Sequence, residues 1–128
     1  KNVAVLGLLS VCLLLVGCQT ASQTSSSASP YMGTWTIVVA GDIVGSTSST
    51  IDANGDFSFS VFVTSAAGSY TSIISGTIDA SGNVSGYSYY GGSKSATISG
   101  KMIGSAGSGT YTAISGYVGT GTWTMTKH

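Results

Sequence analysis

The chain has 128 residues, of which only 6% are charged, and four basic and four acidic residues give a formal net charge of zero. The basic residues are all Lys and the acidic residues are all Asp, so the chain has no Arg and no Glu. A nucleic-acid-binding protein needs a basic patch, and this composition therefore predicts no nucleic-acid partner.

The first 17 residues have the pattern of a secretory signal. Lys1 supplies a positive charge, an uncharged and mostly apolar stretch covers residues 3–16, and residues 15–18 read Leu-Val-Gly-Cys. A signal peptide combines a positive start, about 7–15 apolar residues and small residues before the cut, whereas a transmembrane helix needs about 20 apolar residues. We therefore predict a cleaved signal peptide over residues 1–17.

The Leu-Val-Gly-Cys sequence at residues 15–18 resembles the lipobox of bacterial lipoproteins. The resemblance implies a diacylglyceryl group on the Cys18 thiol, cleavage before Cys18 and acylation, such as palmitate, of the new amine. Two or three acyl chains anchor a protein stably, at about 0.8 kcal/mol per buried CH₂. Gln19, rather than Asp, follows Cys18, which by similarity to the enterobacterial sorting pattern implies the outer membrane. The expected partner is thus the membrane, through lipid on Cys18.

Residues 18–30 are expected to form the lipidated Cys and a flexible tether. After Cys18 the stretch is rich in Ser and Thr, has no large apolar residue and ends at Pro30, the only proline. Such a segment cannot bury enough surface to offset the entropy of ordering, and its twelve residues would span roughly 20 Å. Cys12 would leave with the signal peptide, so we expect no disulfide and no free thiol in the mature domain.

Residues 31–128 are predicted to form one all-β domain. Apolar and aromatic side chains alternate with Ser and Thr, and this period of two is typical of half-buried antiparallel strands. The alternation and the Gly-containing breaks between runs predict eight strands, near 34–40, 43–51, 57–64, 69–79, 83–90, 94–103, 109–115 and 120–127. Short strands at regular spacing favour an up-and-down meander.

Two near-identical turns mark the meander at residues 52–56 and 79–83, which read Asp-Ala-Asn-Gly-Asp and Asp-Ala-Ser-Gly-Asn. Asp in the first position and Gly in the fourth fit a type I turn followed by a G1 bulge, with the Gly at positive φ. Asp side chains in such turns accept hydrogen bonds from nearby backbone. We therefore interpret Asp52, Asp56 and Asp79 as turn residues.

The two ends of this domain carry matching sequences, Gly-Thr-Trp-Thr at residues 33–36 and again at 121–124. Pairing of the first strand with the last would close a small barrel and remove the exposed edges. A two-layer β-sandwich is the alternative. In the barrel we expect the two Trp to be buried near one another at one end. We also expect a narrow lumen filled by the large side chains of Trp35, Phe57, Phe59, Ile74, Ile98 and Trp123.

The Gly-Thr-Trp sequence at residues 33–35 resembles the Gly-x-Trp start of lipocalins and the Gly-Thr-Trp start of avidins, which are eight-stranded meander barrels. The resemblance implies a calycin-like fold. Lipocalins place an Arg against that Trp, and this chain has no Arg. The small barrel inhibitors of bacterial metalloproteases are similar in size and compartment, although they usually carry a disulfide. No ligand site is carried over from these families.

No catalytic group is expected in the domain, and we predict no enzyme activity, no cofactor and no metal. His128 is the only His and the last residue, and a Ser or Thr nucleophile needs a positioned base. Asp52 and Asp56 belong to one loop, whereas the paired carboxylates of a glycosidase face each other across a cleft. Residues 52–56 also resemble a calcium loop, but the distal bidentate acid of such loops is missing.

The function expected from the sequence is a non-enzymatic binding, adhesion or structural role in the cell envelope. An envelope protein, a glycan or a small apolar ligand is the candidate partner. One alternative is a lipocalin-like carrier of a small apolar ligand, which a cavity above about 300 Å³ would favour. Another is a periplasmic protease inhibitor. Six Tyr residues could form an aromatic patch, but we interpret them as cross-strand packing; they are Tyr70, Tyr87, Tyr89, Tyr90, Tyr111 and Tyr117.

Overall fold

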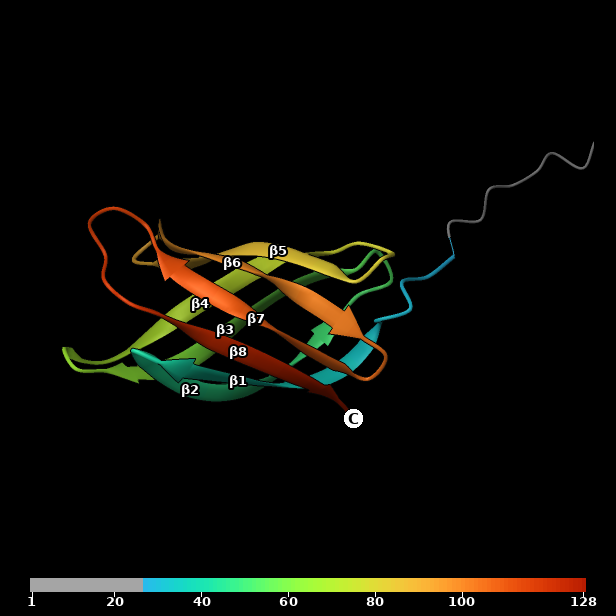
Figure 1. Cartoon of the computed structure of the whole chain (residues 1–128), viewed down its shortest axis with the longest axis horizontal. Helices are drawn as coiled ribbons and strands as arrows, with labels where there is room; N and C mark the ends of the chain where they lie inside the picture. The colour runs from blue at the N-terminus through green and yellow to red at the C-terminus, as the bar shows by residue number, and fades with distance from the viewer. Residues whose placement is uncertain (1–26) are drawn as a thin grey trace, which may run out of the picture.

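The computed structural model describes residues 27–128, so the predictions for the signal peptide and for Cys18 lie outside the described residues. Eight antiparallel strands pair in chain order, and β1 also pairs with β8, which closes a barrel (Figure 1). The predicted eight-stranded meander barrel is therefore confirmed, and the sandwich alternative is wrong. The strands are β1 (Gly33–Gly41), β2 (Ile43–Ile51), β3 (Asp56–Ser65), β4 (Gly68–Ile78), β5 (Asn83–Tyr90), β6 (Ser93–Ile103), β7 (Ala106–Ala113) and β8 (Thr120–Lys127). Over residues 27–128 no helix has the length and apolar character to cross a membrane.

Strand β7 begins three residues earlier than the sequence pattern predicted. Residues 106–108, which lie between the predicted strands 94–103 and 109–115, belong to β7, and Ile103 pairs with Ala106 across a turn made by Gly104 and Ser105. Gly104 has φ near 60°, a conformation that glycine adopts without steric cost. The turn therefore comes immediately before the small residues at 106–108, which belong to the strand.

The β1–β8 pairing places the two Trp residues at different levels of the barrel. Val39 pairs with Trp123, whereas Trp35 pairs with Lys127. Both indoles are buried, as predicted, but they lie four residues apart along the strands. The expectation that both lie at one end is wrong, because the antiparallel register pairs the start of β1 with the end of β8.

One end of the barrel is closed by Trp35 and by the chain that leads into β1. The Trp35 side chain is fully buried, and its Nε1 donates a hydrogen bond to the Tyr31 carbonyl oxygen at 2.8 Å. The Ser29 amide donates to the Ala53 carbonyl oxygen at 2.7 Å, which ties this segment to the β2–β3 turn. Ile51 and Met102, both almost fully buried, complete the packing among the most buried side chains. The N-terminal segment thus enters the barrel at its closed end.

The two Asp–Gly turns are built as the sequence predicted. Asp52 Oδ1 accepts hydrogen bonds from the Asn54 and Asp56 amides, and Asp79 Oδ1 accepts from the Ser81 and Asn83 amides, all at 2.8–2.9 Å. The fourth residue of each turn, Gly55 or Gly82, has φ of 85° or 89°. These turns lie at the closed end, where the Ile78 amide donates to the Gly55 carbonyl and the Met102 amide to the Gly82 carbonyl.

Pairs of glycines on neighbouring strands make room for aromatic rings inside the barrel. Gly100 on β6 pairs with Gly109 on β7, and a Cβ on either residue would overlap the Trp123 indole on β8. Gly76 and Gly86 form a second such pair, where a Cβ on Gly76 would lie 2.8 Å from the Phe57 ring. The glycines inside these strands are therefore required by the packing of the rings.

Candidate functional site

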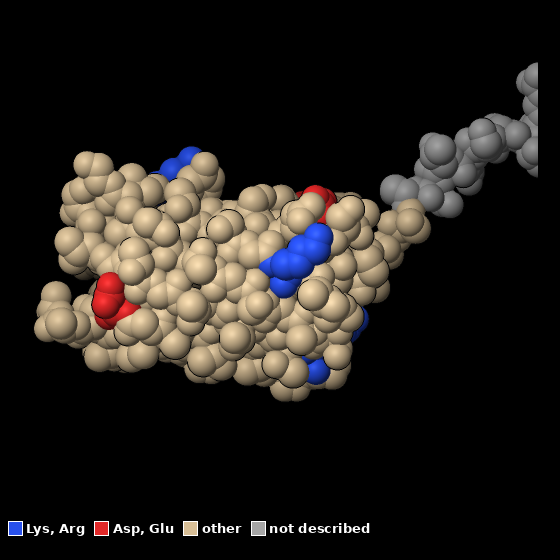
Figure 2. Space-filling model, viewed as in Figure 1, with Lys and Arg blue, Asp and Glu red and all other residues tan. Residues whose placement is uncertain are grey.

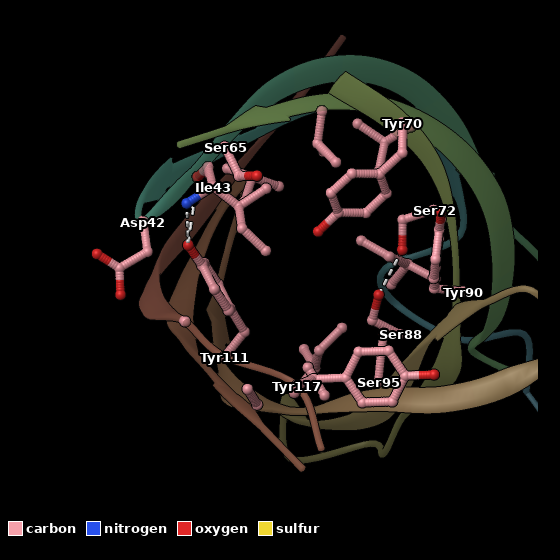
Figure 3. A pocket seen from close by; sticks show the side chains of 18 of the residues that line it. Asp42, Ile43, Ser65, Tyr70, Ser72, Ser88, Tyr90, Ser95, Tyr111 and Tyr117 are labelled. Carbon is pink, nitrogen blue, oxygen red and sulfur yellow. Dashed lines mark hydrogen bonds between the residues drawn. The ribbon is translucent and has the colours of Figure 1, made fainter. Parts of the chain in front are cut away.

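The interior of the barrel holds a cavity of about 610 Å³ that opens at the end opposite Trp35. Its mouth is formed by the β1–β2 turn at Asp42, the β3–β4 turn at residues 65–68 and the β7–β8 loop at residues 116–119. Figure 3 shows the side chains that line it. Ligand pockets in proteins have volumes of about 300–1,000 Å³, so this cavity has the size of a binding site.

Small side chains on four neighbouring strands account for the open space. Ser72 on β4, Ser88 on β5, Ala96 on β6 and Ala113 on β7 all line the cavity, and the register pairs Ser88 with Ala96 and Ala96 with Ala113. Strands β1 and β3 line the same cavity with larger side chains, such as Val39 and Val63. The barrel is thus packed solid at one end and hollow at the other.

The predicted filling of the lumen is wrong for the open half of the barrel. Of the six residues expected to fill it, Trp35 packs the closed end, and the other five line the cavity wall instead; they are Phe57, Phe59, Ile74, Ile98 and Trp123. Period-two alternation from Ile74 and Ile98 points to Ser72 and Ala96 on the same inward face. The small residues at these positions leave the lumen open even though large side chains occupy neighbouring positions on the same face.

The cavity wall is mainly apolar, and most of its polar groups are paired with one another. The Ser72 and Ser88 hydroxyls share a hydrogen bond, and Ser72 Oγ also donates to the Tyr89 carbonyl oxygen at 3.2 Å. The Tyr111 hydroxyl accepts from the Ile43 amide at 2.9 Å and donates to the Ile43 carbonyl at 3.2 Å. These hydrogen bonds hold Ser72, Ser88 and Tyr111 in place, and each of the three hydroxyls has a partner within the protein.

The Tyr70 hydroxyl points from β4 into the open space, and no dashed hydrogen bond reaches it in Figure 3. Its ring is held edge-on against the Tyr90 ring, with 4.9 Å between the centroids. Burial is the main cause that raises the pKa of Tyr70 above its usual value of 10.0, followed by repulsion from the phenolates that Tyr111 and Tyr90 would form. Tyr70 is therefore a protonated hydroxyl at neutral pH, able to donate to or accept from a ligand.

Charge is almost absent from the cavity and sparse on the surface. Asp42 is the one charged side chain among the described residues that line the cavity. Figure 3 shows its carboxylate turned away from the opening, and Asp42 Oδ2 accepts a hydrogen bond from the Thr120 amide at 2.9 Å. The visible face of the molecule carries only isolated Lys and Asp side chains (Figure 2). Among the described residues the cavity lining therefore holds no cation, and its one carboxylate is engaged by the backbone at the rim.

Of the four Asp residues, only Asp42 lines the cavity. Asp52, Asp56 and Asp79 lie in the closed-end turns, and hydrogen bonds from the Asn83 side chain and backbone lower the pKa of Asp79. Within residues 27–128 no group of three or more His, Cys, Asp and Glu side chains is placed to hold a metal ion. The structure thus gives Asp52 and Asp79 the predicted turn geometry.

His128 is held more firmly than expected for a chain end. Its amide donates to the Thr34 carbonyl at 3.0 Å, and its ring makes a hydrogen bond with the Thr36 hydroxyl. Both contacts lie on the outside of β1, so the imidazole is remote from the mouth. The hydrogen bond to Thr34 thus continues the β1–β8 pairing by one residue beyond the end of β8 at Lys127.

The Tyr residues divide between the inside and the outside of the barrel. Tyr70, Tyr90, Tyr111 and Tyr117 line the cavity. Tyr87 lies on the outer face, where the Lys94 ammonium sits 3.8 Å from its ring centroid. The predicted cross-strand packing holds for the Tyr70–Tyr90 pair, but the residues do not form one group, because successive side chains of β5 alternate between the two faces.

Comparison with known proteins assigns no family to the chain, since no family model matches it and no curated protein matches it.

Proposed function

We propose that this protein is a lipid-anchored barrel of the cell envelope that binds a small, largely apolar ligand in its cavity. The observation that carries the proposal is the open cavity of about 610 Å³ with its mainly apolar wall. Among the functions expected from the sequence, this volume favours the lipocalin-like carrier, because it exceeds the roughly 300 Å³ at which ligand pockets begin.

A cavity of this size can bury enough apolar surface of a ligand to give measurable affinity. A ligand that buries about 300 Å² of apolar surface gains about 7–8 kcal/mol from the hydrophobic effect. Ordering of the ligand and loss of its free motion reduce that gain. We therefore expect dissociation constants in the micromolar range or weaker, which suits a carrier that must also release its ligand.

The proposed role is non-enzymatic. The Ser72 and Ser88 hydroxyls bond to each other, the Tyr111 hydroxyl bonds to the Ile43 backbone, and His128 lies on the outer face near the closed end. A hydroxyl nucleophile needs a base within hydrogen-bond reach. Binding without reaction is the role that this set of side chains supports.

The proposed anchor would orient the barrel with its mouth away from the membrane. The described chain enters β1 at the closed end, through the segment Ser29–Met32 that bonds to the β2–β3 turn and to Trp35. Lipid on Cys18, at the other end of the preceding segment, would therefore lie on the side of the barrel opposite the cavity mouth. The ligand would be exchanged with the aqueous space or with a partner beyond it.

Blocking the cavity should abolish binding without unfolding the barrel. We expect Ala96→Phe to place a ring in the empty space and to weaken binding of an apolar fluorescent probe at least about tenfold. The matched control is Thr97→Phe, which adds the same ring to the exposed face of β6. Probe titration and a thermal melt of each variant are the measurements. Equal binding by Ala96→Phe and the wild type would show that the probe does not enter the cavity.

The anchor is tested separately by Cys18→Ser. We expect the wild-type protein to partition into detergent and the variant to be released or left unprocessed, because only the thiolate of Cys can take the diacylglyceryl group. The measurement is intact-mass spectrometry of membrane-derived protein together with detergent partitioning. An unmodified Cys18 in the membrane fraction would contradict the anchor and would leave the cavity proposal standing.

A further inference from the structure

The lumen of the barrel offers no counter-charge to an anionic ligand. Among the described residues, neither Lys nor His lines the cavity. Lys94 stacks on Tyr87 outside the barrel, and Lys127 lies 5.8 Å from the Trp35 ring at the closed end. A carboxylate or phosphate entering the cavity would lose its water without gaining a cation, and burial of an unpaired charge is strongly unfavourable.

The rim does not select a cation either. Asp42 is engaged by the Thr120 amide through Oδ2, and its carboxylate is directed away from the opening (Figure 3). An ammonium group seated inside the cavity would therefore lack a facing carboxylate.

One polar group inside the mouth is directed at the space that a ligand would occupy. The Tyr70 hydroxyl points toward the centre of the opening, whereas the Ser72 and Ser88 hydroxyls are bonded to each other deeper in the wall. Below this level the wall continues through Phe57, Trp123 and other apolar side chains to the closed end. The cavity is thus apolar at depth, with a neutral donor and acceptor near its mouth.

We infer, building on the proposed ligand-binding function, that the cavity takes an uncharged amphiphile whose apolar body lies in the depth of the barrel and whose single hydroxyl or carbonyl oxygen hydrogen-bonds with Tyr70. Long-chain alcohols and neutral lipids have this chemistry. Fatty acids in their ionised form and alkylamines in their protonated form do not.

Three probes with the same alkyl chain and different head groups test this inference at neutral pH: 1-decanol, decanoate and decylamine. The closed barrel of residues 27–128 has its own core, so it can be studied without detergent, which would compete for the cavity. Trp123 lines the cavity, and its fluorescence reports occupancy. We expect decanol to bind at least about tenfold more tightly than either charged probe.

The head-group contact is tested by Tyr70→Phe. Loss of one neutral hydrogen bond should weaken decanol binding about two- to tenfold, and Tyr87→Phe, which removes the same hydroxyl from the outer face, should leave it unchanged. Lowering the pH until decanoate becomes decanoic acid should strengthen binding of that probe to near the decanol value. Equal effects of the two Tyr variants would overturn the Tyr70 contact.

Binding of the three probes to the wild type and to Ala96→Phe separates a wrong ligand class from a wrong function. If decanoate or decylamine binds as tightly as decanol to the wild type, and Ala96→Phe abolishes that binding, the cavity binds ligands but the uncharged class is wrong. If none of the three probes binds, or all bind equally to Ala96→Phe, the proposed function itself is wrong.

Discussion

Trp35→Ala should cost the barrel about 3–5 kcal/mol, the range found when a large aromatic side chain is removed from a core. The side chain is fully buried, and its Nε1 holds the Tyr31 carbonyl that closes the end of the barrel. A domain of this size is stable by about 5–15 kcal/mol, so the variant loses a large share of its stability. Urea unfolding followed by circular dichroism measures the loss.

Val44→Ala is the control for this experiment, because Val44 lies on a strand but is 49% exposed. We expect Val44→Ala to change the free energy of unfolding by less than about 1 kcal/mol. A Trp35→Ala protein as stable as this control would show that the closed end does not depend on the indole. The stability of Trp35→Phe should fall between those of Trp35→Ala and Val44→Ala, because the variant keeps an aromatic ring but loses the hydrogen bond to Tyr31.

Gly109→Ala is expected to destabilise the barrel by about 1–3 kcal/mol or more through overpacking. A Cβ on Gly109 would overlap the Ser99 carbonyl oxygen and the Trp123 indole, and it would lie 2.7 Å from the Cα of Gly100. Two of these three neighbours are backbone atoms and cannot move aside cheaply. Backbone entropy alone predicts the opposite sign, because Gly in a strand is less stable than Ala by roughly 0.5–1 kcal/mol. Measured melting temperatures and urea midpoints decide between the two effects.

The neighbouring residue on the same strand provides the control for Gly109→Ala. Ser108 is exposed on β7, so Ser108→Ala changes the strand without adding an atom to the interior. We expect its stability to stay close to the wild type. A Gly109→Ala protein more stable than the wild type would mean that β6 and β7 can separate enough to admit the methyl group.

The fold was predictable because its strands and turns have local sequence patterns and its two ends carry the same sequence. Alternation marked the strands, the Asp-x-x-Gly sequences at residues 52–55 and 79–82 marked two turns, and the matched ends around Trp35 and Trp123 indicated closure. The position of β7 was missed because Gly104 and Ser105 form a two-residue turn, while the longer run of small residues after them is strand. Composition alone does not distinguish a turn glycine from one that makes room for a ring.

The cavity was predictable only in part. Its wall residues on the inward face followed from alternation, but whether a lumen is filled depends on the register between strands. Ser88, Ala96 and Ala113 leave a void because the register sets them side by side. Cross-strand packing of the Tyr residues was predicted, but the alternation does not specify which rings pair, and the Tyr70 ring is held against Tyr90, twenty residues away in the chain.

The two ends of the barrel differ in how much change they can tolerate. At the closed end, a Cβ on Gly55 or Gly82 would collide with the carbonyl of Ile78 or Met102. At the mouth, Gly68, Gly91 and Gly116 have no atom within 4 Å of the place where a Cβ would stand, so only their positive φ values favour glycine there. Insertions in the mouth loops would project into solvent, and surface loops accept added length at little cost. The barrel therefore combines a base in which the backbone is tightly packed with loops around the cavity mouth whose length can change at little cost to the fold.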